Sequence, residues 1–198
     1  MLFWDACIVY AAHIWGYWAT VMVTCAMDNS QWSTACAKIV IRNQLLFTPL
    51  LAPLLLVATT QPFSTSCLLW QIPGAVVLSD IFFYPMHRML HHHTLYSMHA
   101  AHHEWEKPIG MSALYADVFE HCVVNMVPPL LSGIVVGMNP AVMALWAAAA
   151  SANTVWAHAW ENQHTDHHEL RTKNFGVGLM AMDRVMGTLY TEKKPRRK

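Results

Sequence analysis

Three long stretches of this chain contain no charged residue. They are residues 6–27, 43–79 and 121–160. Only 12% of all residues are charged and 55% are hydrophobic, whereas soluble domains carry about 25% charged residues. A membrane-spanning helix needs about 20 consecutive apolar residues. The sequence therefore predicts an all-α fold, an integral membrane helical bundle.

The second and third stretches are each too long for one spanning helix. Pro62 and the polar run 61–66 divide the second, and the turn signal Met138-Asn139-Pro140 divides the third. With 198 residues, we expect a single membrane-embedded domain, residues 1–198. The five predicted membrane segments are residues 6–26, 44–60, 67–86, 122–137 and 140–158.

The basic residues predict the orientation of these segments. Lys and Arg occur only at residues 38–42, at 88–107 and from residue 171 to the end. With five segments these three regions fall on one side, and the positive-inside rule makes that side cytoplasmic. A multi-pass protein is predicted, with residues 1–5 and 61–66 on the opposite side. The formal net charge of zero gives no indication of nucleic-acid binding.

Histidines are concentrated in the C-terminal half of the chain. Twelve of the thirteen follow residue 86, and two clusters share the form HxxHH, at residues 99–103 and 164–168. On a helix, positions i, i+3 and i+4 share one face, so three imidazoles can point at one metal centre. The predicted metal ligands are His87, His91, His92, His99, His102, His103, His158, His164, His167 and His168.

The type of metal follows in part from elimination. The histidine clusters contain no cysteine, which argues against a thiolate zinc site, and HExxH is absent. Imidazole suits zinc, copper, iron and nickel alike, and so many histidines exceed the demand of one ion. We therefore expect a histidine-rich di-metal cap on the cytoplasmic side. A histidine-rich metal transporter is an alternative, although it would place ligands along a path through the membrane.

Three histidine boxes and their neighbours resemble a known family. The first reads Asp80-x3-Tyr84-x2-His87-Arg88-x2-His91-His92, and the boxes at 99–103 and 164–168 are followed by Asp183-Arg184-x2-Gly187-Thr188. Their order and spacing resemble the fatty acid hydroxylase/sterol desaturase superfamily of integral membrane di-iron oxygenases. The segment from His102 to Met111 is most similar to C-4 methylsterol oxidases.

This resemblance implies an oxidoreductase, a non-haem di-iron lipid monooxygenase that hydroxylates an unactivated C–H bond. It implies two iron ions, O2 as co-substrate, and electrons from NAD(P)H through a cytochrome b-type haem protein or a reductase. It further implies a membrane lipid substrate, first of all a sterol, and the endoplasmic reticulum membrane in a eukaryote. A sphingoid-base or fatty acyl hydroxylase, a sterol 25-hydroxylase, a desaturase and an inactive relative stay open as alternatives.

Carboxylates near the boxes are the predicted supporting catalytic residues. Asp80 lies two turns before His87 and is expected to hydrogen-bond a ligating imidazole. Asp117 stands where the family commonly has histidine, and it is expected to ligate the metal or to support a ligand. Glu120 is expected to support a ligand. Asp183 is expected to pair with Arg184.

The link between His158 and the third box is unusually short. Five residues separate His158 from His164, whereas the resembling enzymes usually have a longer insert there. Five residues span at most about 20 Å between the flanking Cα atoms. His158 is therefore expected to lie close to His164 and to serve the same di-metal centre.

Overall fold

The computed structural model describes residues 3–51 and 65–191, and this part of the chain contains helices and turns but no strand. The all-α prediction is confirmed for these residues. The α-helices are α1 (Phe3–Met27), α2 (Thr34–Arg42), α4 (Thr65–Leu90), α5 (Val127–Val135), α6 (Pro140–Ala159), α7 (Gln163–Leu170) and α8 (Ala181–Val185). Two π-helical segments, Asn43–Phe47 and Glu120–Met126, and the short 3-10 turns Asn29–Gln31, Thr48–Leu51, Tyr96–Met98, His102–Glu104 and Gly110–Leu114 complete the described elements.

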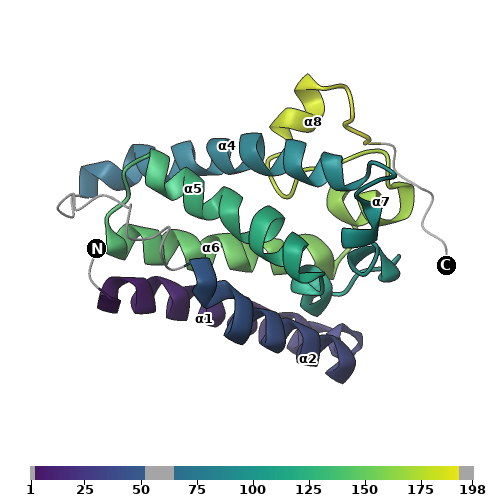
Figure 1. The fold of residues 1–198 in the computed structure, drawn as a ribbon, viewed down its shortest axis with the longest axis horizontal. Coiled ribbons are helices and arrows are strands. Elements are labelled where there is room, and N and C mark those ends of the chain that lie inside the picture. The colour runs from purple at the N-terminus through teal and green to yellow at the C-terminus, as the bar shows by residue number, and fades with distance from the viewer. Residues whose placement is uncertain (1–2, 52–64, 192–198) are drawn as a thin grey trace.

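The long helices form a bundle, and the short elements gather at one end of it. Figure 1 shows α1, α4, α5 and α6 running along the length of the molecule. Helices α7 and α8 lie at the end of the bundle nearest the C-terminus. Helix α1 packs mainly on α6, and α4 packs on α5. The contact between α1 and α6 depends on Gly16, because a Cβ atom there would lie 2.4 Å from the Ala148 carbonyl oxygen.

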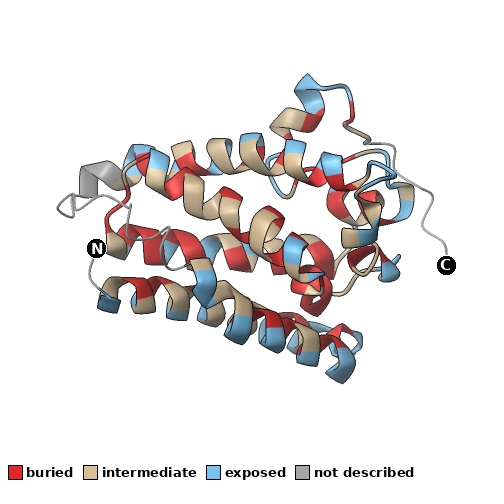
Figure 2. Ribbon diagram, viewed as in Figure 1, coloured by how far each residue is buried: buried red, intermediate tan, exposed pale blue. Residues whose placement is uncertain are grey.

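Two described helices are long and apolar enough to cross a membrane. They are α1 and residues Leu68–Leu90 of α4, which contain most of the predicted segments 6–26 and 67–86. Large apolar side chains, including Trp15 on α1 and Leu69 on α4, are exposed on these helices, and Figure 2 shows exposed positions along their outer faces. Such faces fit a lipid environment better than water.

The other predicted segments correspond to less regular structure. Segment 122–137 falls on a π-helical stretch followed by α5, and segment 140–158 falls on α6. The predicted segment 44–60 begins in the π-helical and 3-10 turns up to Leu51, and its remainder lies outside the described residues. The dividing residue Pro62 also lies outside them.

Local capping fixes the turn that separates α5 from α6 and the turn that separates α6 from α7. Asn139 caps α6 by accepting a hydrogen bond from Val142 N (3.0 Å), as its position before a proline predicts. Asn162 caps α7 in the same way, accepting a hydrogen bond from His164 N (2.7 Å). The second cap makes the connection from α6 to α7 tight, so the ends of both helices reach the same region.

Candidate metal centre

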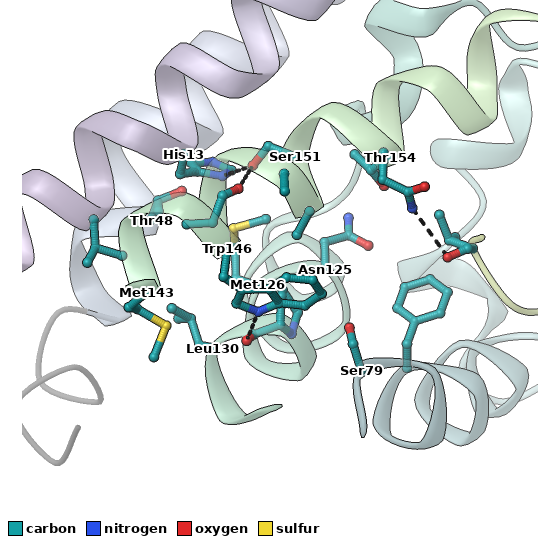
Figure 3. Close-up of a pocket in the computed structure, with 18 of the residues that line it drawn as sticks. His13, Thr48, Ser79, Asn125, Met126, Leu130, Met143, Trp146, Ser151 and Thr154 are labelled. Carbon is teal, nitrogen blue, oxygen red and sulfur yellow. Dashed lines mark hydrogen bonds between the residues drawn. The ribbon is translucent and has the colours of Figure 1, made fainter. Parts of the chain in front are cut away.

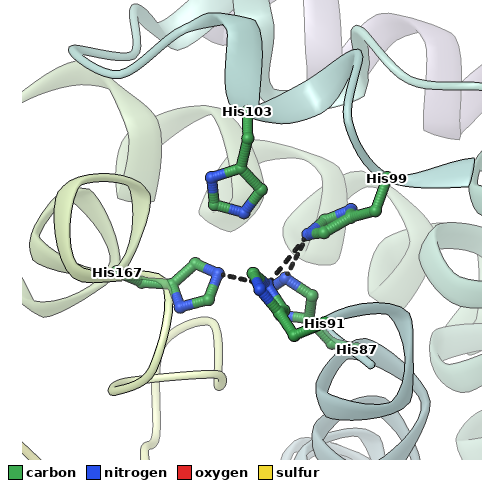
Figure 4. Close-up of side chains that lie close together, drawn as sticks. All are labelled: His87, His91, His99, His103 and His167. Atoms are coloured by element: carbon green, nitrogen blue, oxygen red, sulfur yellow. Dashed lines mark hydrogen bonds between the residues drawn. The ribbon is translucent and has the colours of Figure 1, made fainter. Parts of the chain in front are cut away.

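Five histidines form a first group of convergent imidazoles. Their ligand nitrogen atoms all lie within 4.8 Å of one another, and four of the five residues are buried, with His91 half-buried. Figure 4 shows the five rings pointing toward one another from α4, from the segment after it, and from α7. The members of this five-histidine group are His87, His91, His99, His103 and His167.

Four further histidines form a second group beside the first. They are all buried and their ligand nitrogen atoms also lie within 4.8 Å of one another. His158 is central, because its Nε2 atom lies 3.3 Å from His102 Nε2 and 3.2 Å from His164 Nε2. The members of this four-histidine group are His102, His158, His164 and His168.

The outward-facing nitrogen of most of these rings is held by a backbone carbonyl. His87 Nδ1 lies 2.6 Å from the Phe175 oxygen and His164 Nδ1 lies 2.8 Å from the Gly176 oxygen. Because a carbonyl only accepts hydrogen bonds, each Nδ1 must carry the proton, and each Nε2 presents its lone pair to the centre. The same contact is made by His102 to Tyr115, His158 to Thr154, His167 to Lys173 and His168 to Trp105.

These tautomers leave lone pairs facing one another between the rings. His158 Nε2 and His164 Nε2 both present lone pairs and are 3.2 Å apart, so they cannot hydrogen-bond each other. Two nitrogen ligands on one metal, each about 2.0–2.1 Å from it, are separated by about 3.0–3.4 Å for right-angled to tetrahedral bonds. The pairs His91–His99 (3.1 Å) and His91–His167 (3.0 Å) have the same spacing. The donor set therefore fits bound metal ions.

Burial keeps the imidazoles neutral. It lowers the pKa of His91, His99 and His164 to about 3 in each case. A neutral ring at physiological pH is the form that binds metal. The centre is therefore ready to ligate without first losing protons to solvent.

Glu120 is buried behind one ligand of the five-histidine group. Its Oε2 lies 2.9 Å from His99 Nδ1, at an angle outside hydrogen-bond geometry, with the carboxylate side chain 2% exposed. Burial raises the pKa of Glu120 to about 8. A cation on the far nitrogen of His99 would favour the ionised carboxylate, which would then hold the Nδ1 proton and direct the Nε2 lone pair inward.

A cavity of about 590 Å³ lies close to the histidine groups, although none of their nine members is among its lining residues. Four of its lining residues connect it to the groups. The Phe83 ring contacts the His87 ring at 5.0 Å between centroids, and the Thr154 carbonyl accepts from His158. Leu114 and Val177 are adjacent in sequence to the carbonyl partners Tyr115 and Gly176. Most of the remaining lining is apolar and comes from α1, α4, α5 and α6 (Figure 3). Its size lies within the roughly 300–1,000 Å³ usual for ligand sites.

Comparison with known proteins assigns the chain to a family. The family model described as fatty acid hydroxylase matches residues 72–188. The chain belongs to the fatty acid hydroxylase family. The matched region contains every histidine of both groups, and it places the chain in the fatty acid hydroxylase/sterol desaturase superfamily, as the spacing of the boxes predicted. Its relatives include proteins named as hydroxylases and monooxygenases.

Several curated relatives are similar over part of their length. Fatty acid hydroxylase domain-containing protein 2 of Homo sapiens is 34% identical over 57% of this chain and 36% of its own length. Fatty acid hydroxylase ahd1 of Mycosarcoma maydis is 32% identical, over 53% and 30% respectively. Methylsterol monooxygenase erg25B of Aspergillus fumigatus is 27% identical, over 86% and 67%. The chain thus spans about a third of the first two relatives. No solved structure matches it.

The structure brings nine of the ten predicted ligands of this family member into the two groups. The exception is His92, which is exposed and whose Nδ1 lies 2.8 Å from Thr94 Oγ1. Helix α4 ends at Leu90, so the residues after it form turns, and the backbone directs His91 inward and His92 outward. His92 lies outside both sets of converging nitrogen atoms.

The HxxHH boxes are divided between the groups, which differs from the expectation that each box serves one centre. In the second box, His99 and His103 join the five-histidine group and His102 joins the other. In the third box, His164 and His168 join the four-histidine group, whereas His167 joins the five-histidine group. Residues i and i+4 therefore share a group, and residue i+3 belongs to the neighbouring one.

Two of the three predicted carboxylates make other contacts. Asp80 Oδ2 accepts from Met182 N (2.8 Å) and not from an imidazole, since His87 Nδ1 donates to the Phe175 carbonyl instead. Asp117 is exposed, and its Oδ1 accepts from Phe119 N two residues ahead (2.8 Å). Asp80 thus docks the start of α8, and Asp117 stabilises a local turn. Only Glu120 lies against a member of the histidine groups.

Asp183 has a supporting position that the sequence did not reveal. Its carboxylate is fully buried and accepts from Phe175 N (2.9 Å) and Gly176 N (2.7 Å). The carbonyls of these same two residues hold His87 and His164. A Cβ atom at Gly176 would lie 2.9 Å from Asp183 Oδ2, so glycine leaves space for this carboxylate. Asp183 was expected to pair with Arg184, but it organises the segment that orients two ligands.

Proposed function

We propose that this protein is an O2-dependent di-iron hydroxylase of a membrane lipid. The observation that carries the proposal is the set of facing Nε2 lone pairs, which are spaced as ligands of bound cations would be. When bound, two iron ions would supply the activation of O2 and the oxidation of a C–H bond, with electrons from NAD(P)H delivered by a cytochrome b-type haem protein or a reductase. Iron is preferred over other imidazole-binding metals because the family is iron-dependent.

Each group would hold one iron. The five-histidine group (His87, His91, His99, His103 and His167) and the four-histidine group (His102, His158, His164 and His168) supply nine ligands. Glu120 is the one predicted supporting carboxylate that we retain, as a positioning residue for His99. The backbone carbonyls around Phe175 and Gly176 fix ring orientation, and the burial of the rings excludes water from the reacting region.

The substrate would occupy the cavity that lies close to both groups. Its apolar lining and its place among candidate membrane helices favour a lipid over a water-soluble substrate. Among lipids, a sterol is the first class to test, because methylsterol monooxygenases are among the relatives. A fatty acyl or sphingoid-base substrate, oxidation of a sterol side chain, and desaturation instead of hydroxylation are further candidates.

The membrane arrangement belongs to the same proposal. We infer a single multi-pass domain over residues 1–198, with the metal centre as a cap on the cytoplasmic side and, in a eukaryote, in the endoplasmic reticulum membrane. The gathering of the histidines at one end of the bundle favours this over a metal transporter, whose ligands would follow a path between the membrane faces.

Lipid profiling of a host lacking its own methylsterol oxidase tests the proposal. We expect expression of the chain to deplete accumulated methylsterols and to yield oxidised products, and expression of the His164→Ala variant to do neither. Parallel incubations with labelled fatty acyl and sphingoid lipids would identify another substrate class. Purified protein with two irons that oxidises none of these lipids, despite O2 and a competent electron donor, would point to an inactive relative.

A further inference from the structure

The wall of the cavity carries a polar site that is separate from the histidine groups. His13 on α1, Thr48, Asn125 and Ser151 on α6 all line the cavity. In Figure 3 the His13–Ser151 pair and Asn125 lie on different parts of the wall. None of these residues belongs to either group of predicted metal ligands. Polar groups in such an apolar cavity need partners, and the partners identify what the cavity can hold.

The His13–Ser151 pair has a defined hydrogen-bond direction. The Ser151 hydroxyl donates to the Ala147 carbonyl oxygen (2.7 Å). Ser151 Oγ therefore accepts the proton of His13 Nδ1, which lies 2.7 Å away. His13 Nε2 is then a lone-pair acceptor, and its nearest partner, Gln44 Nε2, is 3.5 Å away, at the limit of a hydrogen bond. The pair thus has acceptor capacity left and no free donor.

Asn125 offers the opposite capacity. Its Nδ2 atom is buried and has no hydrogen-bond partner among the described residues. Leaving a buried donor unpaired is unfavourable, so such a group indicates a missing partner. The side chain lines the same cavity as His13 and Ser151. A ligand oxygen in the cavity can accept this hydrogen bond.

We infer that His13, Ser151 and Asn125 bind the hydroxyl group of a neutral lipid. A hydroxyl donates one hydrogen bond and accepts others, so its chemistry matches both the acceptor capacity of the pair and the donor capacity of the amide. The inference rests on the proposed function only in taking the cavity as the substrate site.

The absence of a cation among the lining residues narrows the ligand class further. The described lining contains no Lys or Arg, and Asp80 is its one acidic residue. A buried carboxylate without a partner cation is strongly unfavourable. The cavity is therefore suited to a sterol or a long-chain alcohol and unsuited to a free fatty acid.

The position of the site fits a lipid that extends toward the metal centre. Ser151 and Thr154 precede the ligand His158 on α6 by seven and four residues, which is about two turns and one turn. Thr154 lines the cavity between the polar site and His158. A lipid held by its hydroxyl at the level of Ser151 lies about 10 Å along α6 from His158.

Equilibrium binding to the full chain tests the inference without turnover. The purified protein, kept anaerobic and without reductant, is titrated with cholesterol and with cholest-5-ene, which lacks only the hydroxyl. One hydrogen bond to a neutral group is worth roughly three- to tenfold in binding, so we expect about tenfold preference for cholesterol. Oleyl alcohol should likewise bind more tightly than oleate.

Two variants assign the preference to this site. Asn125→Leu and Ser151→Ala should each reduce the preference for cholesterol to about threefold or less, while the affinity for cholest-5-ene stays within about twofold of wild type. Asn29→Leu, at an exposed residue that does not line the cavity, is the matched control and should keep the full preference. Melting curves verify that each variant is folded.

Equal affinities of the wild type for cholesterol and cholest-5-ene would overturn the inference, as would tighter binding of oleate than of oleyl alcohol. Retention of the full preference in both folded variants would overturn it as well. Failure of the proposed function looks different: the hydroxyl preference would be present, but no lipid would be oxidised when O2 and electrons are supplied. Oxidation without hydroxyl preference would refute only the polar site.

Discussion

If the proposed di-iron centre is correct, replacing His158 with alanine should remove one of the two irons and abolish turnover. His158 Nε2 is the atom that joins the four-histidine group, 3.3 Å from His102 and 3.2 Å from His164. Its loss leaves three imidazoles and removes the nitrogen that lies beside both His102 Nε2 and His164 Nε2. The five-histidine group is untouched. We therefore expect iron content to fall from about two to about one per chain, and activity to fall by at least about 100-fold, beyond the effect of losing an outer supporting residue.

Elemental analysis of purified, iron-replete protein measures the first effect, and oxygen uptake with the identified lipid measures the second. His92→Ala is the matched control, because His92 belongs to the same histidine-rich region but is exposed and bonded only locally to Thr94. It should keep about two irons and most of its activity. An iron content of two together with unchanged turnover in His158→Ala would refute the assignment of His158 as a ligand.

Four further outcomes follow from the structure. Glu120→Gln should lower iron affinity about 10–100-fold in a chelator competition, because the carboxylate positions His99; unchanged affinity would exclude that role. Asp183→Asn should destabilise the protein by about 1.5–3 kcal/mol in thermal or denaturant unfolding, since Phe175 N and Gly176 N donate to different oxygens of Asp183 and an amide retains only one of the two. For metal-free protein, stability should decline as pH falls from about 6.5 toward 3, by about 1.4 kcal/mol per pH unit for each histidine whose folded pKa is about 3, because the unfolded rings bind protons that the buried ones do not; a flat profile would contradict this. Cysteines placed at Ser66 and Thr191 in a cysteine-free background should react with an impermeant reagent from opposite sides of sealed vesicles, and labelling from one side would rule out the five-segment topology.

The positions of the long helices could be predicted from where charges are absent. The stretches 6–27 and 121–160 fall on α1 and on the π-helix, α5 and α6, and the turn at Asn139-Pro140 was visible as a turn signal. These features depend on composition and local capping, which a sequence displays directly. The membership of nine histidines in two groups was also predictable, because dense imidazoles beside apolar segments have few structural explanations.

The division of the histidine boxes and the partners of two carboxylates could not be predicted from the sequence. Reading the boxes as regular helix placed three rings at one metal centre. The box at 164–168 is helical in α7 and still divides its rings between the two groups. In the box at 99–103, a turn precedes the 3-10 turn His102–Glu104, and α4 ends before His91. The partners of Asp80 and Asp183 were also hidden. Asp183 lies seven or eight residues from the amides it binds, in a segment without regular periodicity. Only the folded chain shows that the two carboxylates support neighbouring loops.

The division of each HxxHH box explains why the two groups form one centre. In the box at 99–103, adjacent His102 and His103 belong to different groups, and His167 and His168 are divided in the same way. Two pairs of adjacent residues therefore connect the groups, one pair in the segment after α4 and one pair in α7. Because neighbouring residues cannot move independently, a shift of either segment displaces ligands of both groups at once. The pairing of adjacent histidines thus fixes the separation of the two groups, as the proposed reaction with two metals on one substrate would require.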